Sequence, residues 1–154
     1  MRKITPFLWF DGNAEEAVNL YVSLFESAKI RSISRYSDAG PLPKGAVMTV
    51  AFTLNNQDFV ALDGGPEYKF TPAVSFSVDC ETQAEIDQLW ETLTSDGGKE
   101  IQCGWLVDKF GLSWQIVPSV LPELMSGAKA KRVAEAMFKM KKLDIAKLKA
   151  AAAG

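Results

Sequence analysis

The sequence predicts an α+β fold made of two βαβββ modules and a C-terminal helical extension. Residues 3–65 and 72–118 each contain a strand-like segment, then an amphipathic helix, then further strand-like segments. A shift of 69 residues superposes much of the first pattern on the second. Residues 128–154 return to helical periodicity with many basic side chains. We therefore expect a single domain at residues 1–127, followed by a basic amphipathic tail at 128–154.

The first module begins with an apolar, aromatic segment at residues 4–10 that ends at a turn, Asp11-Gly12. This composition is typical of a strand. Asn13 stands where a helix N-cap belongs, with acidic residues in the first turn after it, which predicts a helix over 13–25. Three strand-like segments follow at residues 30–37, 46–54 and 59–62.

The second module has the same order of segments. Residues 73–79 predict a strand, and Thr82 with Glu85 three residues later is typical of a capping box. Apolar residues then recur at helical spacing, with Trp90 on the inward stripe. Two short strands are predicted near residues 101–107 and 112–117, on either side of a turn at 108–111.

The shift of 69 residues pairs apolar positions in both the strands and the helices. It places Phe7 on Phe76 and Tyr21 on Trp90. Two unrelated amphipathic helices would also match apolar with apolar, but the preceding strands align under the same shift. We therefore interpret the pattern as a repeat of one supersecondary unit.

The C-terminal tail is strongly basic, whereas the rest of the chain is acidic. Residues 128–154 carry eight basic and two acidic side chains, a net charge of +6, which leaves −8 elsewhere because the whole chain carries −2. Apolar residues interleave with the charges at spacings of three to five. We therefore expect an amphipathic helix docked on the acidic body, with its lysines in water. A tail that binds nucleic acid or an anionic membrane is the alternative.

The composition excludes several kinds of chemistry. The chain has no His and only two Cys, which rules out Ser-His-Asp triads, HExxH zinc sites and cysteine-based zinc sites. The one glycine-rich turn, at residues 63–66, runs into prolines rather than a helix, so no nucleotide-type cofactor is expected. The chain shows no signal peptide and no apolar segment of membrane-spanning length, so we expect a cytoplasmic protein.

Four motifs carry a family resemblance. They are TPFLWFDG at residues 5–12, GGPEYKF at 64–70, CGWL at 103–106 and DKFGLSWQ at 108–115. They resemble the PhnB-like family, often described as a 3-demethylubiquinone-9 3-methyltransferase domain, over residues 3–126. This family is a branch of the glyoxalase/bleomycin-resistance/dioxygenase superfamily, also called the vicinal oxygen chelate superfamily. The resemblance implies a half-barrel fold with a ligand cleft.

Metal ligands in this superfamily lie on the first and last strands of each module. The resemblance places those positions near Ile4 or Thr5, Leu62 or Asp63, Val74 or Ser75, and at Gln115. Only Asp63 and Gln115 could bind a metal strongly, and protein metal sites commonly need three or four donors. We therefore expect no metal, and no typical metal-dependent glyoxalase.

Aromatic residues on the predicted strands indicate a small-molecule site. The resemblance brings these aromatic residues around one cleft, together with Gln115. The aromatic residues are Trp9, Phe10, Phe52, Trp105 and Trp114. Aromatic walls with a few polar groups hold flat or apolar ligands. The function predicted is therefore binding of a small apolar or aromatic metabolite without a metal. The alternative is that these tryptophans fill the core.

An enzyme of transferase or isomerase type on the same fold is the competing hypothesis. It would use Asp63 as a general base, provided that burial raises its pKa, or the thiol of Cys103 beside Gly104. A solvated loop carboxylate and an inert buried cysteine are the alternatives for these residues. Half-barrels of this kind commonly pair, so we also expect a homodimer, with no nucleic acid and no membrane among its partners.

Overall fold

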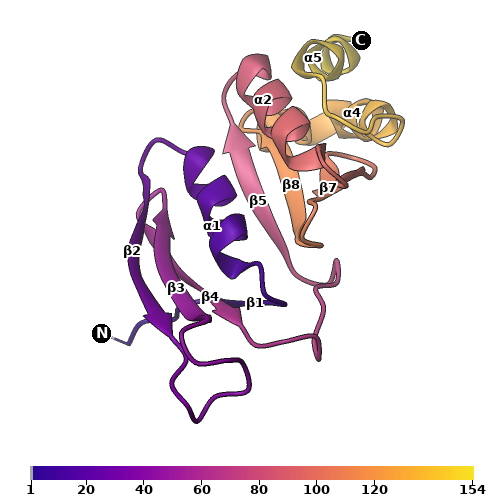
Figure 1. The fold of residues 1–154 in the computed structure, drawn as a ribbon. Coiled ribbons are helices and arrows are strands. Elements are labelled where there is room, and N and C mark those ends of the chain that lie inside the picture. Colours follow the sequence, from indigo (N-terminus) through magenta and orange to yellow (C-terminus); the bar gives the residue numbers. More distant parts are fainter. Residues whose placement is uncertain (1) are drawn as a thin grey trace. The chain divides into compact units, whose positions relative to one another are not determined.

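The structure is a computed structural model that describes residues 2–154. They form two compact units, unit 1 up to Lys69 and unit 2 from Phe70 to Gly154 (Figure 1). Each unit contains one four-stranded mixed sheet with a helix packed on it. Among the described residues, no helix combines the length and the apolar character that a membrane crossing requires.

Unit 1 is a βαβββ module, as predicted. Its strand order is β1-β4-β3-β2, with β1 parallel to β4 and the other neighbours antiparallel. Its elements are β1 (Phe7–Phe10), α1 (Ala14–Ser23), β2 (Ala28–Arg35), β3 (Val47–Leu54) and β4 (Gln57–Asp63).

The turn between β3 and β4 sets the length of β4. Asn55 and Asn56 both have positive φ, 48° and 66°, which is the backbone of a tight two-residue hairpin turn. Because the turn needs only these two residues, β4 begins at Gln57 and is longer than the predicted strand at 59–62.

The two faces of the unit 1 sheet differ in character. Successive residues of a strand point to opposite faces, and paired residues of neighbouring strands share a face. Phe10 and Phe52 are buried on the face against α1. The far face of unit 1, the face turned away from α1, carries Phe7 and Trp9 of β1, Val60 and Leu62 of β4, and Thr49 and Ala51 of β3.

Unit 2 repeats this topology, which confirms the prediction of two βαβββ modules. Its strand order is β5-β8-β7-β6, with β5 parallel to β8. Its elements are β5 (Ser75–Cys80), α2 (Gln83–Thr94), β6 (Lys99–Glu100), β7 (Trp105–Val107), β8 (Ser113–Pro118), α3 (Leu121–Leu124), the short helix η1 (Gly127–Lys129), α4 (Ala130–Met137) and α5 (Ile145–Ala153).

The two long helices of the modules begin differently. Thr82 Oγ1 accepts a hydrogen bond from the Glu85 N–H, which confirms the predicted start of α2. The Asn13 side chain makes no such bond, so the predicted side-chain cap of α1 is wrong. The carboxylate of Asp63, at the end of β4, accepts the Ala14 N–H instead, at 2.9 Å.

The repeat of 69 residues holds for the helices but not for the first strands. Phe7 is 62% exposed on the far face of unit 1, whereas Phe76 packs edge-on against Trp114 on the α2 side of its sheet. The strand-to-helix connector spans residues 11–13 in unit 1 and only 81–82 in unit 2. Because the first connector is one residue longer, the first strands correspond under a shift of 70 and not 69. A shift of one residue moves a strand side chain to the opposite face of the sheet.

The prediction of one strand near residues 101–107 is wrong. This segment contains a turn between β6 and β7, in which Cys103 and Gly104 have φ of 59° and 85°. A strand cannot continue through two residues in the left-handed region. The motif CGWL therefore begins in a turn, and only Trp105 and the residues after it lie in β7.

The tail docks on unit 2 but forms two helices rather than one. A segment without helical structure separates α4 from α5, and it contains the fully buried Leu143. Leu143 joins Leu124, Val133 and Leu148 in a hydrophobic cluster. In Figure 1, α4 and α5 lie beside α2, at one end of the unit 2 sheet. The apolar face of the tail therefore belongs to the core of unit 2.

Candidate functional site

Trp9 is the centre of an aromatic group at the end of β1. Its indole N–H donates to the Gly65 carbonyl at 2.8 Å. The ring meets Tyr68 edge-on, with 4.9 Å between centroids and 82° between the planes, and Tyr68 is 63% exposed. The structure therefore fixes a half-buried tryptophan beside an exposed tyrosine.

Gly64 allows this arrangement because it has no side chain. A Cβ on Gly64 would lie 2.3 Å from the Trp9 ring, closer than any real contact. The backbone of residues 64–65 therefore lies directly against the indole. Such close packing restricts the ring to one orientation before any ligand arrives.

Asp63 points to the opposite side of the sheet. It is buried, and its carboxylate accepts the Ala14 N–H at the start of α1. Burial raises the pKa of this carboxyl, while hydrogen bonds from the Ala14, Gly12 and Asn13 N–H groups oppose the shift. The Tyr36 hydroxyl donates to the Asp63 carbonyl at 2.6 Å. The structure thus gives Asp63 the role of a helix cap, and its use as a general base stays a prediction.

The far face of unit 2, the face turned away from α2, combines one tryptophan with polar groups. Trp105 pairs with Gln115, and the Gln115 Nε2 donates to Ser75 Oγ at 2.9 Å. The Ser113 hydroxyl on this face is buried and has no hydrogen-bond partner among the described residues. This face therefore offers an aromatic ring, an amide and a free hydroxyl.

Three predicted cleft residues, Phe10, Phe52 and Trp114, lie on the helix-covered faces instead. Phe52 is fully buried and stacks on Phe59, with 5.4 Å between centroids. Trp114 is buried, and its indole N–H donates to the Asp108 carboxylate at 2.9 Å. Strand alternation places Trp114 and Gln115 on opposite faces of β8. The structure shows Phe52 and Trp114 as core residues, and a role in ligand binding stays a prediction.

The two cysteines have different surroundings. Cys80 is buried at the end of β5, and burial raises the pKa of its thiol to about 11. Cys103 is half-buried, and its backbone N–H donates to the Met140 carbonyl in the tail at 2.9 Å. A thiol with a pKa near that of Cys80 is almost entirely protonated at neutral pH and so a poor nucleophile. Cys103 is therefore the accessible thiol of the pair.

The residues present do not fit a metal or a nucleotide-type cofactor. Within residues 2–154, no three His, Cys, Asp or Glu side chains gather as a metal site would require. Asp63 already binds backbone N–H groups, and the amide of Gln115 is bonded to Ser75. After Gly64-Gly65 the chain runs through turns without a helix, so the helix N-terminus that receives phosphates is missing there.

Sequence reasoning missed the residues that fix Trp9. Gly64, Gly65 and Tyr68 stand together in the motif GGPEYKF, which indicated a family resemblance and a glycine-rich turn but no contact with Trp9. Two glycines followed shortly by a tyrosine are a usable signal, because backbone without side chains can approach an aromatic ring. What the sequence did not show is that β1 and β4 are neighbours, which brings this motif to Trp9.

Comparisons with known proteins agree with this fold. The sequence model of the family described as 3-demethylubiquinone-9 3-methyltransferase matches residues 2–117. A Bacillus cereus protein described as a PhnB protein of this methyltransferase type is 43% identical, and its structure superposes with a TM-score of 0.70. The match covers 77% of this chain and 100% of that chain. A search of curated proteins found no match.

More distant structures show the fold alone. A Pseudomonas aeruginosa protein is 22% identical over 77% of this chain and 98% of its own, with a TM-score of 0.63. The fosfomycin resistance protein FosX from Listeria monocytogenes is 12% identical over 82% of this chain and 98% of its own, with a TM-score of 0.56. Another FosX structure contains Mn(II) and sulfate.

Proposed function

Because the chain belongs to the 3-demethylubiquinone-9 3-methyltransferase family, whose PhnB-like members have the glyoxalase-type fold, we propose that it binds a small apolar or aromatic molecule at Trp9. The observation that supports this is the fixed Trp9–Tyr68 pair. A ring already held in one orientation loses little entropy when a flat ligand stacks on it. The family description names a substituted quinone-type ring, which has the size and shape for such stacking.

The neighbouring residues of the far face of unit 1 favour an apolar ligand. Phe7 stands two residues before Trp9 on β1, and Val60 and Leu62 are their partners on β4. None of these side chains carries a charge, so the ligand class is uncharged and flat. Aromatic and aliphatic walls of this kind are typical of small-molecule sites.

Unit 2 carries a second set of ligand-binding groups in this proposal, on its own far face. Trp105 and Gln115 share the far face of unit 2 as an aromatic ring beside an amide. An amide can orient a ligand carbonyl or hydroxyl by hydrogen bonding. We include these residues as ligand-binding groups, and binding uses no metal.

The test is a binding measurement with duroquinone, a fully substituted benzoquinone that does not readily add thiols. Trp9→Ala should weaken binding about tenfold or more, because it removes the stacking surface. Trp90→Phe is the control, since Trp90 is buried in the unit 2 core and bonds to Glu100. Calorimetry measures both affinities.

Two results would overturn the proposal. Equal affinity of Trp9→Ala and the unmodified protein would show that the ligand does not stack there. Failure of duroquinone and of a panel of neutral bicyclic aromatics to bind the unmodified protein would remove the ligand class. Gly64→Ala, which displaces the indole without removing it, guards against a loss caused by poor folding of Trp9→Ala.

The second candidate is an enzyme, favoured by the raised pKa of Asp63. Burial of a carboxyl can bring its pKa toward the range useful for a general base. Asp63→Asn keeps an oxygen that accepts the Ala14 N–H but cannot take a proton from a substrate. If turnover of a bound aromatic is found and this variant abolishes it while the fold is kept, Asp63 is catalytic.

We also propose that the protein is a cytoplasmic homodimer without nucleic acid or membrane partners. The half-barrel fold, which commonly pairs, supports the dimer, and the tail, whose basic side chains interleave with apolar ones, supports the absence of nucleic acid and membrane partners. Light scattering after gel filtration measures the mass directly. A mass near 16.9 kDa, that of one chain, would exclude the dimer.

A further inference from the structure

The turn between β6 and β7 is held by the tail as well as by its own hairpin. Cys103 N–H donates to the Met140 carbonyl at 2.9 Å, and Gly104 N–H donates to the Lys141 carbonyl at 2.8 Å. Two consecutive backbone donors of the turn therefore find their acceptors about forty residues further along the chain. Without the tail, these two N–H groups would need other acceptors.

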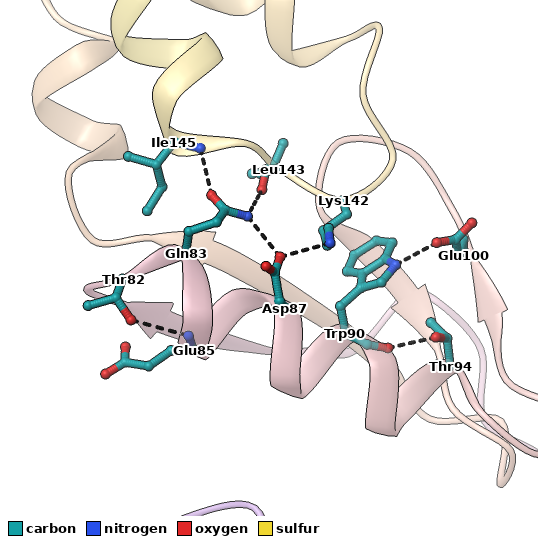
Figure 2. A network of polar contacts seen from close by, with 10 residues as sticks. All are labelled: Thr82, Gln83, Glu85, Asp87, Trp90, Thr94, Glu100, Lys142, Leu143 and Ile145. Carbon is teal, nitrogen blue, oxygen red and sulfur yellow. Dashed lines mark hydrogen bonds and ion pairs between the residues drawn. The ribbon is translucent and has the colours of Figure 1, made fainter.

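Gln83, the first residue of α2, holds the same tail segment from the other side. Its Nε2 donates to the Leu143 carbonyl at 3.0 Å, and its Oε1 accepts the Ile145 N–H at 2.8 Å (Figure 2). One side chain thus satisfies both a donor and an acceptor of the tail backbone. Asp87, one helical turn away, accepts from Gln83 and forms an ion pair with Lys142 at 2.8 Å.

Packing between the tail and the turn leaves no space. A Cβ added to Gly104 would lie 2.9 Å from the Leu143 side chain and 2.9 Å from the Ile116 carbonyl. Leu143 is fully buried. Only glycine fits at this position, both because of its positive φ and because the tail side chain occupies the space of a Cβ.

The strands on either side of the turn are too short to hold it alone. β6 has two residues and β7 has three, and a hairpin of this length is marginal in water. Trp105 is the first residue of β7 and hydrogen bonds directly to the turn, from its N–H to the Gln102 carbonyl at 3.1 Å. Pairing with Gln115 of β8 sets the position of Trp105 on one side, and the turn, which the tail helps to hold, sets it on the other.

We propose that the tail segment 140–145, held by Gln83, positions the 101–104 turn and thereby Trp105 on the far face of unit 2. Gln83 is a positioning residue, acting through the tail and the turn. The effect on ligand affinity rests on the proposed function, whereas the effect on the turn does not. The family match ends at Val117, so the positioning segment lies outside the matched residues.

The first experiment needs no ligand. Gln83→Ala should speed amide hydrogen exchange in residues 101–107 and thiol labelling of Cys103, each about tenfold, because loss of two hydrogen bonds favours local opening of the tail. Cys80 stays unlabelled at neutral pH, since it is buried and the pKa of its thiol is about 11. Gln57→Ala, an exposed change in unit 1, is the matched control.

Gln83→Glu tests the donor side of Gln83. It keeps an oxygen for the Ile145 N–H but loses the donor to the Leu143 carbonyl and sets a second carboxylate beside Asp87, so it should speed exchange and labelling at least as much as Gln83→Ala. Unchanged exchange and labelling in Gln83→Ala would overturn the role of Gln83. Faster exchange in residues 145–153 without any change in residues 101–107 would overturn the link between tail and turn.

The second experiment measures duroquinone affinity in the same variants. If the inference is right, Gln83→Ala weakens duroquinone binding to the far face of unit 2, which is measured in the Trp9→Ala background, and duroquinone slows Cys103 labelling in the unmodified protein, because coupling between two sites is reciprocal. Equal affinity despite faster labelling would disprove the effect on the ligand. If duroquinone binds neither protein, the proposed function fails, while the exchange data still decide whether the tail positions the turn.

Discussion

Unit 1 and unit 2 share one strand order but hold their sheets together by different means. In unit 1, strands β2, β3 and β4 have seven or eight residues and pair along their length. In unit 2, β6 and β7 have two and three residues, and the tail supplies hydrogen bonds and a buried leucine to the turn that joins them. The same topology is therefore stable with long strands alone, or with short strands and an added segment.

The aromatic groups of the far faces follow the same division. In unit 1, Trp9 is fixed by the linker residues Gly64 and Gly65, which directly follow the neighbouring strand β4. In unit 2, Trp105 is fixed through a turn that the distant tail holds. Changes in the tail should therefore affect the unit 2 site and leave the unit 1 site unchanged.

The largest effect should come from removing the buried tail leucine. Leu143→Ala deletes a fully buried side chain that contacts Gly104, so it should lower the free energy of unfolding by about 2–5 kcal/mol. The loss of hydrogen-exchange protection should be confined to unit 2. Urea unfolding followed by hydrogen exchange measures both quantities.

Ile4→Ala is the control for that substitution. Ile4 is also aliphatic but is 93% exposed, so its replacement should change the stability by less than about 0.5 kcal/mol. Loss of protection in β1 and β4 of the Leu143→Ala protein would contradict the division between the units, because those strands lie in unit 1.

A smaller difference should separate the two helix caps. Asp63→Ala leaves the buried Ala14 N–H without its acceptor, which should cost about 1–3 kcal/mol. Thr82→Ala removes the exposed cap of α2 and should cost about 1 kcal/mol. Chemical unfolding of both variants measures the two losses of stability. A larger loss for Thr82→Ala than for Asp63→Ala would show that the cap from Asp63 is the weaker one.

These caps also show what a sequence can and cannot predict. The side-chain cap of Thr82 is local, with both partners within a few residues, and it was predicted correctly, although the Glu85 carboxylate accepts from the Glu81 N–H and not from Thr82 as a full capping box requires. The cap of α1 comes from Asp63, about fifty residues away, and no local pattern marks it. The order of elements along the chain within the two modules and the family were predictable because periodicity and motifs are also local.

The candidate site was harder to predict because it depends on strand register. Trp114 and Gln115 are adjacent in sequence but point to opposite faces, and the sequence pattern did not show which face each would take. Likewise, the sequence pattern did not show that Phe7 and Phe76 take opposite faces of their sheets, which follows from the difference of one residue between the two strand-to-helix connectors. The role of Gln83 depends on a tail contact about sixty residues away, which helical periodicity does not reveal.

The smallest effect should come from the ion pair that joins the tail to α2. The Lys142 ammonium, hydrogen-bonded to Asp87, lowers the pKa of that carboxyl, and the Gln83 amide adds to the shift. A carboxyl whose pKa is lower in the folded than in the unfolded state stabilises the protein at pH values above its unfolded-state pKa, near 3.8. This stabilisation is lost as the pH falls through the folded-state pKa. Asp87→Asn should therefore cost less than about 1 kcal/mol near neutral pH, since both side chains are substantially exposed. Urea unfolding of both proteins at neutral and acid pH measures this difference, which should shrink in acid and in high salt. An equal difference at both pH values would show that the carboxylate charge is not its source, and that the tail is held here by the Gln83 hydrogen bonds and the buried Leu143 alone.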